Sequence, residues 1–359
     1  MKILQVITTL GFGGAEKLIL EISPIMRDKG HQIDVLSFDG VETPFKSALI
    51  EAGINVYSFG ENCNVYNPFF IIKLARLMKG YDIVHTHNTA AQLFAAFARI
   101  CSKVKLITTE HNTYNRRRDI SWLKWLDRFM YSKYQSIICI SNLTRKNLVL
   151  HLPSIEQKSI VVNNGINISK YSEATISEEA MSLRADGDII VTMVGGFRYQ
   201  KDQDTIIRSL KRLPNNFKLW LVGDGERRPQ IEKLIHALEV QSRVHLWGVR
   251  EDIPELLKSS DIVVMSSHWE GFGLAAAEGM AAGRPVIASN VDGLSQVVGG
   301  AGLLFEPGND QELSSLLQYV MTDNKEYHRI VQRQNDRVRD FGIERMVEEY
   351  LKIYNTMLS

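Results

Sequence analysis

Residues 265–289 read MSSHWEGFGLAAAEGMAAGRPVIAS, and this stretch changes from a strand pattern to a glycine turn, a helix and a second strand. The apolar residues at either end are typical of buried strands, whereas the alanines between them favour a helix. Strands that alternate with helices indicate parallel strands joined by crossover helices. The stretch therefore predicts an α/β domain with a parallel sheet.

Two carboxylates, Glu270 and Glu278, stand at the start and inside the helical part of this stretch. If the helix begins near Gly273, the amides of Phe272, Gly273 and Leu274 point outward without partners and favour an anion. Such an anion would repel a carboxylate, so we expect Glu270 to bond neutral hydroxyls. Glu278 lies about 7 Å farther along the helix and can reach another part of the same ligand. The alternative makes Glu270 a charge at the helix start and Glu278 a surface residue.

The same alternation of strands and helices extends along the whole chain of 359 residues, a length that fits two domains. It runs from the first residues to 158–167 and starts again at about residue 188. Between these parts, residues 169–187 are polar and lack a strand pattern, which is typical of a linker. We therefore predict a first domain over 1–168 and a second over 188–339, with the active site in a cleft between them.

The composition limits the classes of protein to which this chain can belong. Apolar residues make up 45% and charged residues 23% of the chain, a mixture typical of globular proteins, and a formal net charge of +1 argues against a nucleic-acid partner. Cys63, Cys101 and Cys139 form no CxxC motif and are odd in number, which favours the reducing cytoplasm. No run reaches 18 apolar residues and no signal peptide is recognisable, so we expect a cytoplasmic protein without a membrane span.

A glycine turn, TLGFGGAEK, follows the first predicted strand and contains Gly11, Gly13 and Gly14. Free amides at the start of the following helix favour an anion there. A dinucleotide fingerprint would need a further glycine at position 16, where this chain has Glu16, so a nicotinamide enzyme is disfavoured. The alternative is a tight turn without a ligand.

A second glycine turn, VGGFRYQKD, places Arg198 and Lys201 just beyond a strand of the second half. Two cations three residues apart can hold a diphosphate, although an ordinary solvated loop is the alternative. The DQD that follows, residues 202–204, imitates a metal-binding DxD motif. It also opens a helical stretch, where carboxylates are favoured by the helix dipole, so we expect no metal.

Histidines gather at the ends of two strands of the first half, in VHTHN and TTEHN. We expect His85 and His87 to point to opposite faces of their strand and therefore to share no metal. His111 can orient a sugar. The alternative for His111 is a loop histidine bonded to backbone.

Residues 99–147 are basic, with eleven Lys or Arg against three acids, and include the aromatic segment SWLKWLDRFMYSKY. Basic residues interleaved with Trp122 and Trp125 suit a surface that meets anionic lipid, so the range 116–134 is a candidate membrane contact. The alternative is a helix that packs its aromatic side chains into the first domain.

Taken in order, these segments resemble the GT-B glycosyltransferases of family 4, which retain anomeric configuration and use nucleotide-sugar donors. The motifs that carry the resemblance are GFGGAE, TEHN, NNGIN, GGFRYQKD, LVGDGE and EGFGLAAAEGMAAGRPVIAS. The resemblance implies two doubly wound, Rossmann-like domains that face each other across a cleft. It also implies that the closing helix, within 340–359, crosses back to the first domain.

The resemblance implies roles for particular residues. Gly14 would lie in a loop over the donor diphosphate, and His111 would lie near the transferred sugar. Arg198 and Lys201 would hold the diphosphate, while Glu270 would contact hydroxyls of the sugar.

For the nucleoside, the resemblance assigns Glu278 to the ribose hydroxyls and the backbone near Val249 and Arg250, in WGVRED, to the base. The amides of Phe272, Gly273 and Leu274 would lie beside the carboxylate that contacts the sugar.

The function that follows is transfer of a sugar, with retention, from a nucleotide-diphosphate donor to a glycan or lipid-linked saccharide in cell-surface polysaccharide or glycoconjugate synthesis. We expect a UDP-linked donor, no metal and no cofactor, and a cytoplasmic protein at the inner face of the membrane. Two alternatives remain open: a sugar-nucleotide 2-epimerase on the same scaffold, and a non-catalytic subunit that binds nucleotide sugars.

Overall fold

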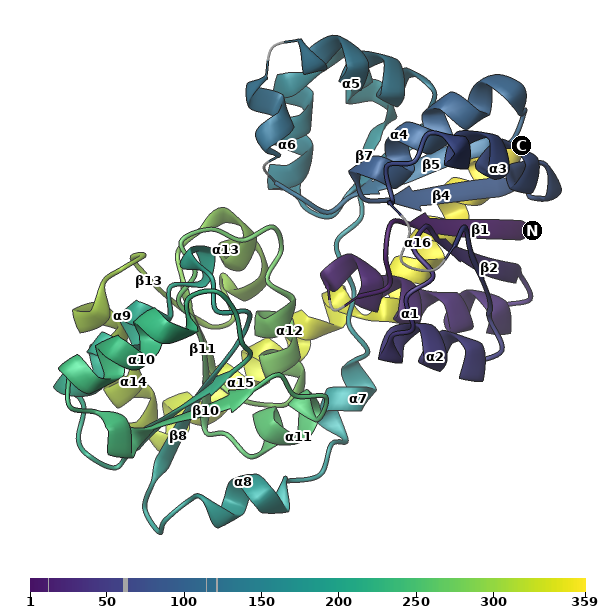
Figure 1. The fold of residues 1–359 in the computed structure, drawn as a ribbon. Coiled ribbons are helices and arrows are strands. Elements are labelled where there is room, and N and C mark those ends of the chain that lie inside the picture. Colours follow the sequence, from purple (N-terminus) through teal and green to yellow (C-terminus); the bar gives the residue numbers. More distant parts are fainter. Residues whose placement is uncertain (12, 61–63, 114, 121) are drawn as a thin grey trace. The chain divides into compact units, whose positions relative to one another are not determined.

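A computed structural model describes residues 1–359 except 12, 61–63, 114 and 121 (Figure 1). The chain forms two compact units, one of Met1–Gly165 with Ile343–Ser359 and the other of Ile166–Gly342. Each unit contains one sheet, and the named strands pair in parallel throughout. The predicted pair of α/β domains with parallel sheets is confirmed.

The first unit holds a seven-stranded sheet with the order β3-β2-β1-β4-β5-β6-β7. Its strands are β1 Lys2–Ile7, β2 Gln32–Ser37, β3 Asn55–Ser58, β4 Ile83–His87, β5 Lys105–Glu110, β6 Ser136–Cys139 and β7 Ser159–Val161. Its helices are α1 Gly14–Asp28, α2 Pro44–Glu51, α3 Phe69–Leu77, α4 Thr89–Ala98, α5 Leu123–Ser132, α6 Asn142–His151 and α16 Ile343–Leu358. The strand order reverses between β1 and β4, so ligands are expected at the carboxyl ends of these strands.

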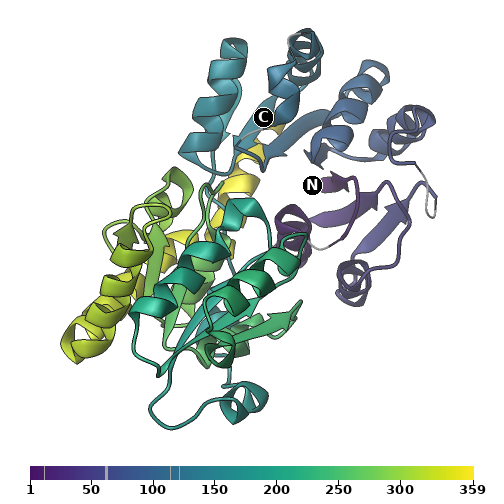
Figure 2. The same ribbon diagram turned by 60° about the vertical axis from the view of Figure 1, so that its left-hand side comes forward.

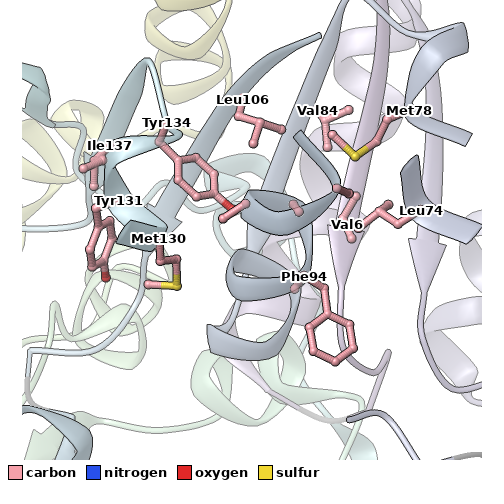
Figure 3. Close-up of a cluster of buried hydrophobic side chains, with 14 of the residues drawn as sticks. Val6, Leu74, Met78, Val84, Phe94, Leu106, Met130, Tyr131, Tyr134 and Ile137 are labelled. Atoms are coloured by element: carbon pink, nitrogen blue, oxygen red, sulfur yellow. The ribbon is translucent and has the colours of Figure 1, made fainter. Parts of the chain in front are cut away.

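The two faces of this sheet bury separate apolar clusters because successive side chains of a strand point to opposite faces. On one face, Val6 and Val84 from the strands pack with Leu74, Met78 and Phe94 from the helices (Figure 3). The opposite face carries the odd-numbered strand residues, from Ile3 to Ile107, together with α1 and α16. Helices therefore cover both faces of the sheet (Figure 2).

The last helix, α16, belongs to the first unit although the chain before it belongs to the second. Its buried residues are those of the apolar stripe in the sequence: Met346, Val347, Tyr350, Leu351 and Tyr354, together with Ile343. They pack beside α1 in the same cluster as the odd-numbered strand residues (Figure 1). The predicted return of the closing helix to the first domain is confirmed.

The second unit holds a six-stranded sheet with the order β10-β9-β8-β11-β12-β13. Its strands are β8 Ile189–Val194, β9 Phe217–Val222, β10 Val244–Gly248, β11 Ile262–Met265, β12 Val286–Ser289 and β13 Leu303–Phe305. Its longer helices are α9 Gln203–Ser209, α10 Arg228–Ala237, α11 Ile253–Lys258, α12 Leu274–Ala281, α13 Asp292–Val298, α14 Asp310–Thr322 and α15 Asn324–Val338. Counted within the unit this order is 3-2-1-4-5-6, the Rossmann arrangement, and it reverses between β8 and β11.

Residues 169–187, for which the sequence predicts a linker, contain most of the helix α7, Ile168–Ser172, and all of α8, Glu178–Ser182. These helices fall in the second unit, where α7 packs against α11 and α12. The amide of Ser177 donates to Ser259 Oγ at 2.9 Å, which ties the segment to α11. The short helices thus form part of the second unit.

Candidate functional site

The centre of the second unit's candidate site is an ion pair between the loops that follow β8 and β11. The Lys201 ammonium pairs with Glu270 Oε1, and Ser267 Oγ donates to the same oxygen at 3.1 Å. Because β8 and β11 flank the point where the strand order reverses, their loops meet where doubly wound sheets bind ligands. Glu270 is 8% exposed, so its negative charge is held in a largely dry position beside a cation.

Two hydrogen bonds to backbone carbonyls join the two loops. Gln200 Nε2 donates to the carbonyl of Trp269 at 3.0 Å, and the amide of His268 donates to the carbonyl of Gln200 at 2.8 Å. Behind them, a Cβ at Gly293 would lie 2.3 Å from the Glu270 carbonyl oxygen, so this position requires glycine. The two loops and the start of α13, which carries Gly293, therefore set the position of Glu270 together.

Helix α12 begins beside this ion pair, at the carboxyl end of β11. The residue that caps its N-terminus, Gly273, has φ 95°, which strongly favours glycine. The amides of the first turn have no carbonyl four residues earlier within the helix to bond. That these amides bind an anion stays a prediction. A Cβ at Gly279 would lie 2.9 Å from Val263, so the small residues of α12 allow the helix to approach β11 closely.

Glu278 lies on α12 and is 5% exposed. The alternative that made it a surface residue is wrong. A carboxylate in such a place must be compensated by hydrogen bonds or charge. Phe272, just before the helix, packs edge-on against Phe341 with ring centroids 5.3 Å apart.

Arg198 lies three residues before Lys201 in the same loop, and its side chain is exposed. The two carboxylates of the DQD sequence already have protein partners. Thr205 Oγ1 donates to Asp202 Oδ2 at 2.6 Å, and Arg227 pairs with Asp204 at 2.9 Å. The contact of Asp202 is typical of a helix start, and the contact of Asp204 is an ion pair.

The predicted base-binding residues follow β10. Val249 is 65% exposed. Arg250 forms ion pairs of 2.7 Å with both Glu179 and Asp252, and its guanidinium lies over the Trp247 ring. Because Arg250 is held by these groups, the accessible feature at this strand end is the exposed segment at Val249.

In the first unit, Gly14 is the first residue of α1 and follows β1 at the point where the strand order reverses. The carboxylate of Glu16 lies at this helix end, because a Cβ at Gly13 would touch it. Asn88 Nδ2 donates to Glu16 Oε1 at 3.4 Å, and burial raises the pKa of Glu16. Glu16 thus occupies the position of a helix-capping carboxylate.

His111 follows β5 and lies against His87, with His111 Nε2 and His87 Nδ1 2.9 Å apart. Among the described residues, the hydrogen-bond partner of its ring is a side chain. The expectation that His85 and His87 point to opposite faces is wrong, since their ring centroids are 4.3 Å apart. Residues two apart on a strand share a face, because side chains alternate.

Burial lowers the pKa of these imidazoles. The pKa of His111 falls to about 4 and that of His85 to about 3, while that of His87 lies well below its ordinary value. Desolvation disfavours the charged form, so all three rings are neutral near neutral pH.

Several buried polar residues beside these histidines were not singled out from the sequence: Gln5, Thr109, Tyr350 and Tyr354. The alternation of side chains along a strand could have revealed them in the sequence. Odd-numbered positions on three adjacent strands hold Gln5, His85, His87 and Thr109, which places these residues on one face of the sheet. The two tyrosines are four residues apart on α16, so they share one face of that helix.

A second missed group surrounds Glu110, the last residue of β5. Its carboxylate accepts hydrogen bonds from Gln92 at 2.6 Å, from the Tyr131 hydroxyl at 2.8 Å and from Arg118 at 3.0 Å. Arg118 Nη1 also donates to the carbonyl of Thr113 at 3.4 Å. This group holds the segment that follows His111 against α4 and α5.

The basic aromatic segment has both buried and exposed aromatic side chains. Met130 and Tyr131 of α5 are buried in the first unit, whereas Trp122 and Trp125 are 63% and 65% exposed. Residue 121 lies outside the described residues. In the part of the chain that the structure describes, no helix is long and apolar enough to cross a membrane.

Known proteins share both the sequence pattern and the fold. Residues 176–337 match the family model of Glycosyl transferases group 1, and residues 12–170 match that of Glycosyltransferase Family 4. Both models are of glycosyltransferases, and with its two Rossmann-type sheets the chain is a glycosyltransferase with the GT-B fold. It belongs to the family 4 glycosyltransferases.

Among curated relatives, the Escherichia coli UDP-Gal:alpha-D-GlcNAc-diphosphoundecaprenol alpha-1,3-galactosyltransferase is 28% identical over 80% of this chain and 79% of its own length. The N-acetyl-alpha-D-glucosaminyl L-malate synthase of Bacillus anthracis is 25% identical over 96% and 94%. Among solved structures, Anabaena HepE in complex with UDP and glucose has a TM-score of 0.87 and 22% identity over 99% of both chains.

Proposed function

We propose that this glycosyltransferase moves a sugar from a UDP-linked donor, with retention of configuration, to a saccharide carried on a lipid diphosphate. The name of the Escherichia coli relative, which specifies a UDP-linked galactose and an acceptor on diphosphoundecaprenol, supports both halves of this proposal. HepE, with UDP and glucose, supports the donor.

The observation that carries the proposal is the pairing of Lys201 with Glu270 where the strand order reverses. A donor diphosphate would recruit Lys201 together with the exposed Arg198, since charge-assisted bonds to phosphate are strong. Glu270 would then accept hydrogen bonds from sugar hydroxyls. The pair therefore keeps a cation and an acceptor ready for two adjacent parts of one ligand.

The rest of the donor is assigned along α12 and β10. The amides that begin α12 at Gly273 would face the diphosphate. Glu278, buried one turn farther along, would bond the ribose hydroxyls, and the exposed segment at Val249 would meet the base. His111, in the first unit, is assigned to the transferred sugar.

Transfer would proceed as the bond from the anomeric carbon to the diphosphate oxygen breaks. Negative charge that develops on the diphosphate is stabilised by Lys201, Arg198 and the α12 amides, and each fixed donor of this kind is typically worth about a hundred- to a thousandfold in rate. The acceptor oxygen forms its bond to the anomeric carbon on the face from which the diphosphate departs, so configuration is retained, and a phosphate oxygen of the leaving group takes the acceptor's proton. Since protein cations neutralise the diphosphate, the reaction would not need a metal.

A lipid-linked acceptor would be met at a membrane surface. The exposed Trp122 and Trp125 lie within a segment that also carries Lys124, Arg128 and Lys133. Indole rings prefer the interface, and each near-surface cation contributes about 1 kcal/mol on anionic lipid. We propose that α5 and the residues before it rest on such a surface.

The test begins with a thermal-shift screen of UDP- and GDP-linked sugars, where a ligand at 100 times its Kd stabilises by about 2.7 kcal/mol. The stabilising donor is then incubated with EDTA and either a polyprenyl-diphosphate saccharide, malate or no acceptor. Transfer to the lipid-linked saccharide, with the donor's anomeric configuration in the product, is the expected result. Transfer to malate would refute the acceptor, an epimer formed without acceptor would refute transfer, and strict dependence on Mg²⁺ would refute the metal-independent mechanism.

A further inference from the structure

A chain of buried hydrogen bonds starts at His111 and runs beneath it into the sheet of the first unit. His111 Nε2 and His87 Nδ1 are 2.9 Å apart, and His87 Nε2 and Gln5 Oε1 are also 2.9 Å apart. His87 and Gln5 are completely buried, so each of these polar groups depends on its protein partners.

A second group of buried hydrogen bonds lies beside this chain and reaches α16. The Tyr354 hydroxyl lies 2.6 Å from His85 Nδ1. His85 Nε2 lies 2.7 Å from Thr109 Oγ1, which is 3.2 Å from the Tyr350 hydroxyl. The closing helix thus supplies two members of this second group, whose His85 ring lies against that of His87.

The amide of Gln5 gives this chain a direction. Its nitrogen donates to Met26 Sδ at 3.9 Å, and its oxygen lies 2.9 Å from His87 Nε2. An amide oxygen can only accept, so His87 Nε2 carries the hydrogen and His87 Nδ1 carries a lone pair. That lone pair must receive a hydrogen from His111 Nε2.

Beside this chain, His85 bonds the Tyr354 hydroxyl through Nδ1 and Thr109 through Nε2, so both of its ring nitrogens have protein partners. Burial keeps the three imidazoles neutral, because it lowers the pKa of each.

We infer that His87 and Gln5 are positioning residues that hold His111 in the tautomer protonated at Nε2. His111 Nδ1 then carries a lone pair, and it accepts a hydrogen bond from a hydroxyl of the bound saccharide. This assignment of Nδ1 to a sugar hydroxyl rests on the proposed function. The tautomer itself rests on the hydrogen-bond chain alone.

The tautomer is measured directly by NMR on protein labelled with ¹⁵N-histidine, with His111→Gln used to assign the His111 signals. The expected spectrum at neutral pH shows His111 protonated at Nε2 and His87 protonated at Nε2. A His111 signal from the Nδ1-protonated form would overturn the inference. Because the measurement needs no sugar, it stands whether or not the protein transfers to the acceptors tried.

Two variants at position 87 separate positioning from folding. His87→Leu removes the acceptor of His111 Nε2–H, so the His111 tautomers should mix. Turnover should fall about 10- to 100-fold, the effect seen when the outer partner of a metal-bound histidine is removed. His87→Asn keeps an oxygen near the place of Nδ1 and should restore the Nε2–H form and most of the turnover. An unchanged His111 spectrum in His87→Leu would overturn the inference.

A pair of tyrosine variants controls for the loss of a buried hydroxyl. Tyr354→Phe removes a hydroxyl that bonds His85 at 2.6 Å, whereas Tyr134→Phe removes a hydroxyl that bonds Thr86 at 3.0 Å on the opposite face of β4. Both rings are buried, so the two variants should lose comparable stability. The His85 signals should shift only in Tyr354→Phe, and the His111 tautomer should persist in Tyr134→Phe. A His111 change in Tyr134→Phe as large as that in His87→Leu would overturn the inference.

If wild-type protein shows the expected tautomer but transfers to no acceptor, the proposed function fails while the positioning chain stands. If transfer occurs and His87→Leu retains both the wild-type turnover and the wild-type spectrum, the positioning chain fails while the proposed function stands.

Discussion

Lys201 and Glu270 form an ion pair that joins the loops after β8 and β11. Their side chains are 21% and 9% exposed, so each charge depends on the other in the absence of a ligand. The pair lies where the strand order of the second sheet reverses. Its two members come from segments about 70 residues apart and meet because adjacent parallel strands end at one edge of the sheet.

Lys201→Ala should lower turnover about a hundred- to a thousandfold, because it removes a fixed cation from the leaving diphosphate. It also leaves Glu270 without its cation, so Lys201→Ala/Glu270→Gln should regain stability but not activity. Turnover and denaturant unfolding measure the two effects. Lys211→Ala, an exposed lysine variant in the same unit, is the control, and wild-type turnover in Lys201→Ala would end the assignment.

Glu278→Gln should weaken UDP binding because a neutral amide replaces a buried acceptor of the ribose hydroxyls. A hydrogen bond to a charged group is worth about 1.5 to 3 kcal/mol, or roughly 10- to 100-fold in Kd. Calorimetry with UDP and its 2′- and 3′-deoxy analogues checks this. At least one deoxy analogue should bind the wild type less tightly than UDP does. The same analogue should bind the variant as tightly as UDP binds the variant. If the losses from the variant and from the analogue simply add for both analogues, the contact is contradicted.

Gly293→Ala should reduce both stability and turnover, because the added Cβ would lie 2.3 Å from the Glu270 carbonyl oxygen. The loop that carries Glu270 must move to accept it, and such overpacking typically costs about 1 to 3 kcal/mol. Gly80→Ala is the matched control, since a Cβ there meets no atom within 4 Å. Equal stability and turnover of the two variants would show that the loop yields without cost.

Acid should destabilise the protein through the buried histidines. Unfolded histidines take up protons below about pH 6.5, whereas the pKa of His111 is lowered to about 4 and that of His85 to about 3. Between these values the unfolded state binds more protons, so stability falls as pH falls, by up to about 1.4 kcal/mol per pH unit for each group.

Denaturant unfolding across that range measures the slope. His85→Gln should give a shallower slope than wild type, whereas the exposed His328→Gln should leave the slope unchanged. A slope that does not differ between His85→Gln and wild type would contradict the role of these histidines in the pH dependence.

Replacement of Trp122 and Trp125 by Ala should reduce flotation with anionic liposomes, because both exposed indoles would leave the interface. Turnover on a water-soluble acceptor should not change. Tyr319→Ala removes an exposed aromatic side chain from the second unit and serves as the control. If wild-type protein does not float, the membrane contact is wrong.

Strand and helix periodicity was enough to predict two parallel-sheet units, because a strand buried on both faces and an amphipathic helix leave distinct patterns over a few residues. That the closing helix joins the first unit was expected from the family resemblance, and the apolar stripe from Met346 to Tyr354 is the face with which it docks. The burial of Glu270 and Glu278 was foreseen only as one of two alternatives. A local pattern reports which residues share a face but not what covers that face.

The alternation of strands and helices, the glycine turns and the family motifs can all be recognised in the residues alone. The fold decides which distant groups meet: Lys201 with Glu270, His111 with His87 and Gln5, and His85 with α16. These contacts depend on strand order and on which face of the sheet each side chain takes, and both bring together residues with no local relation in sequence.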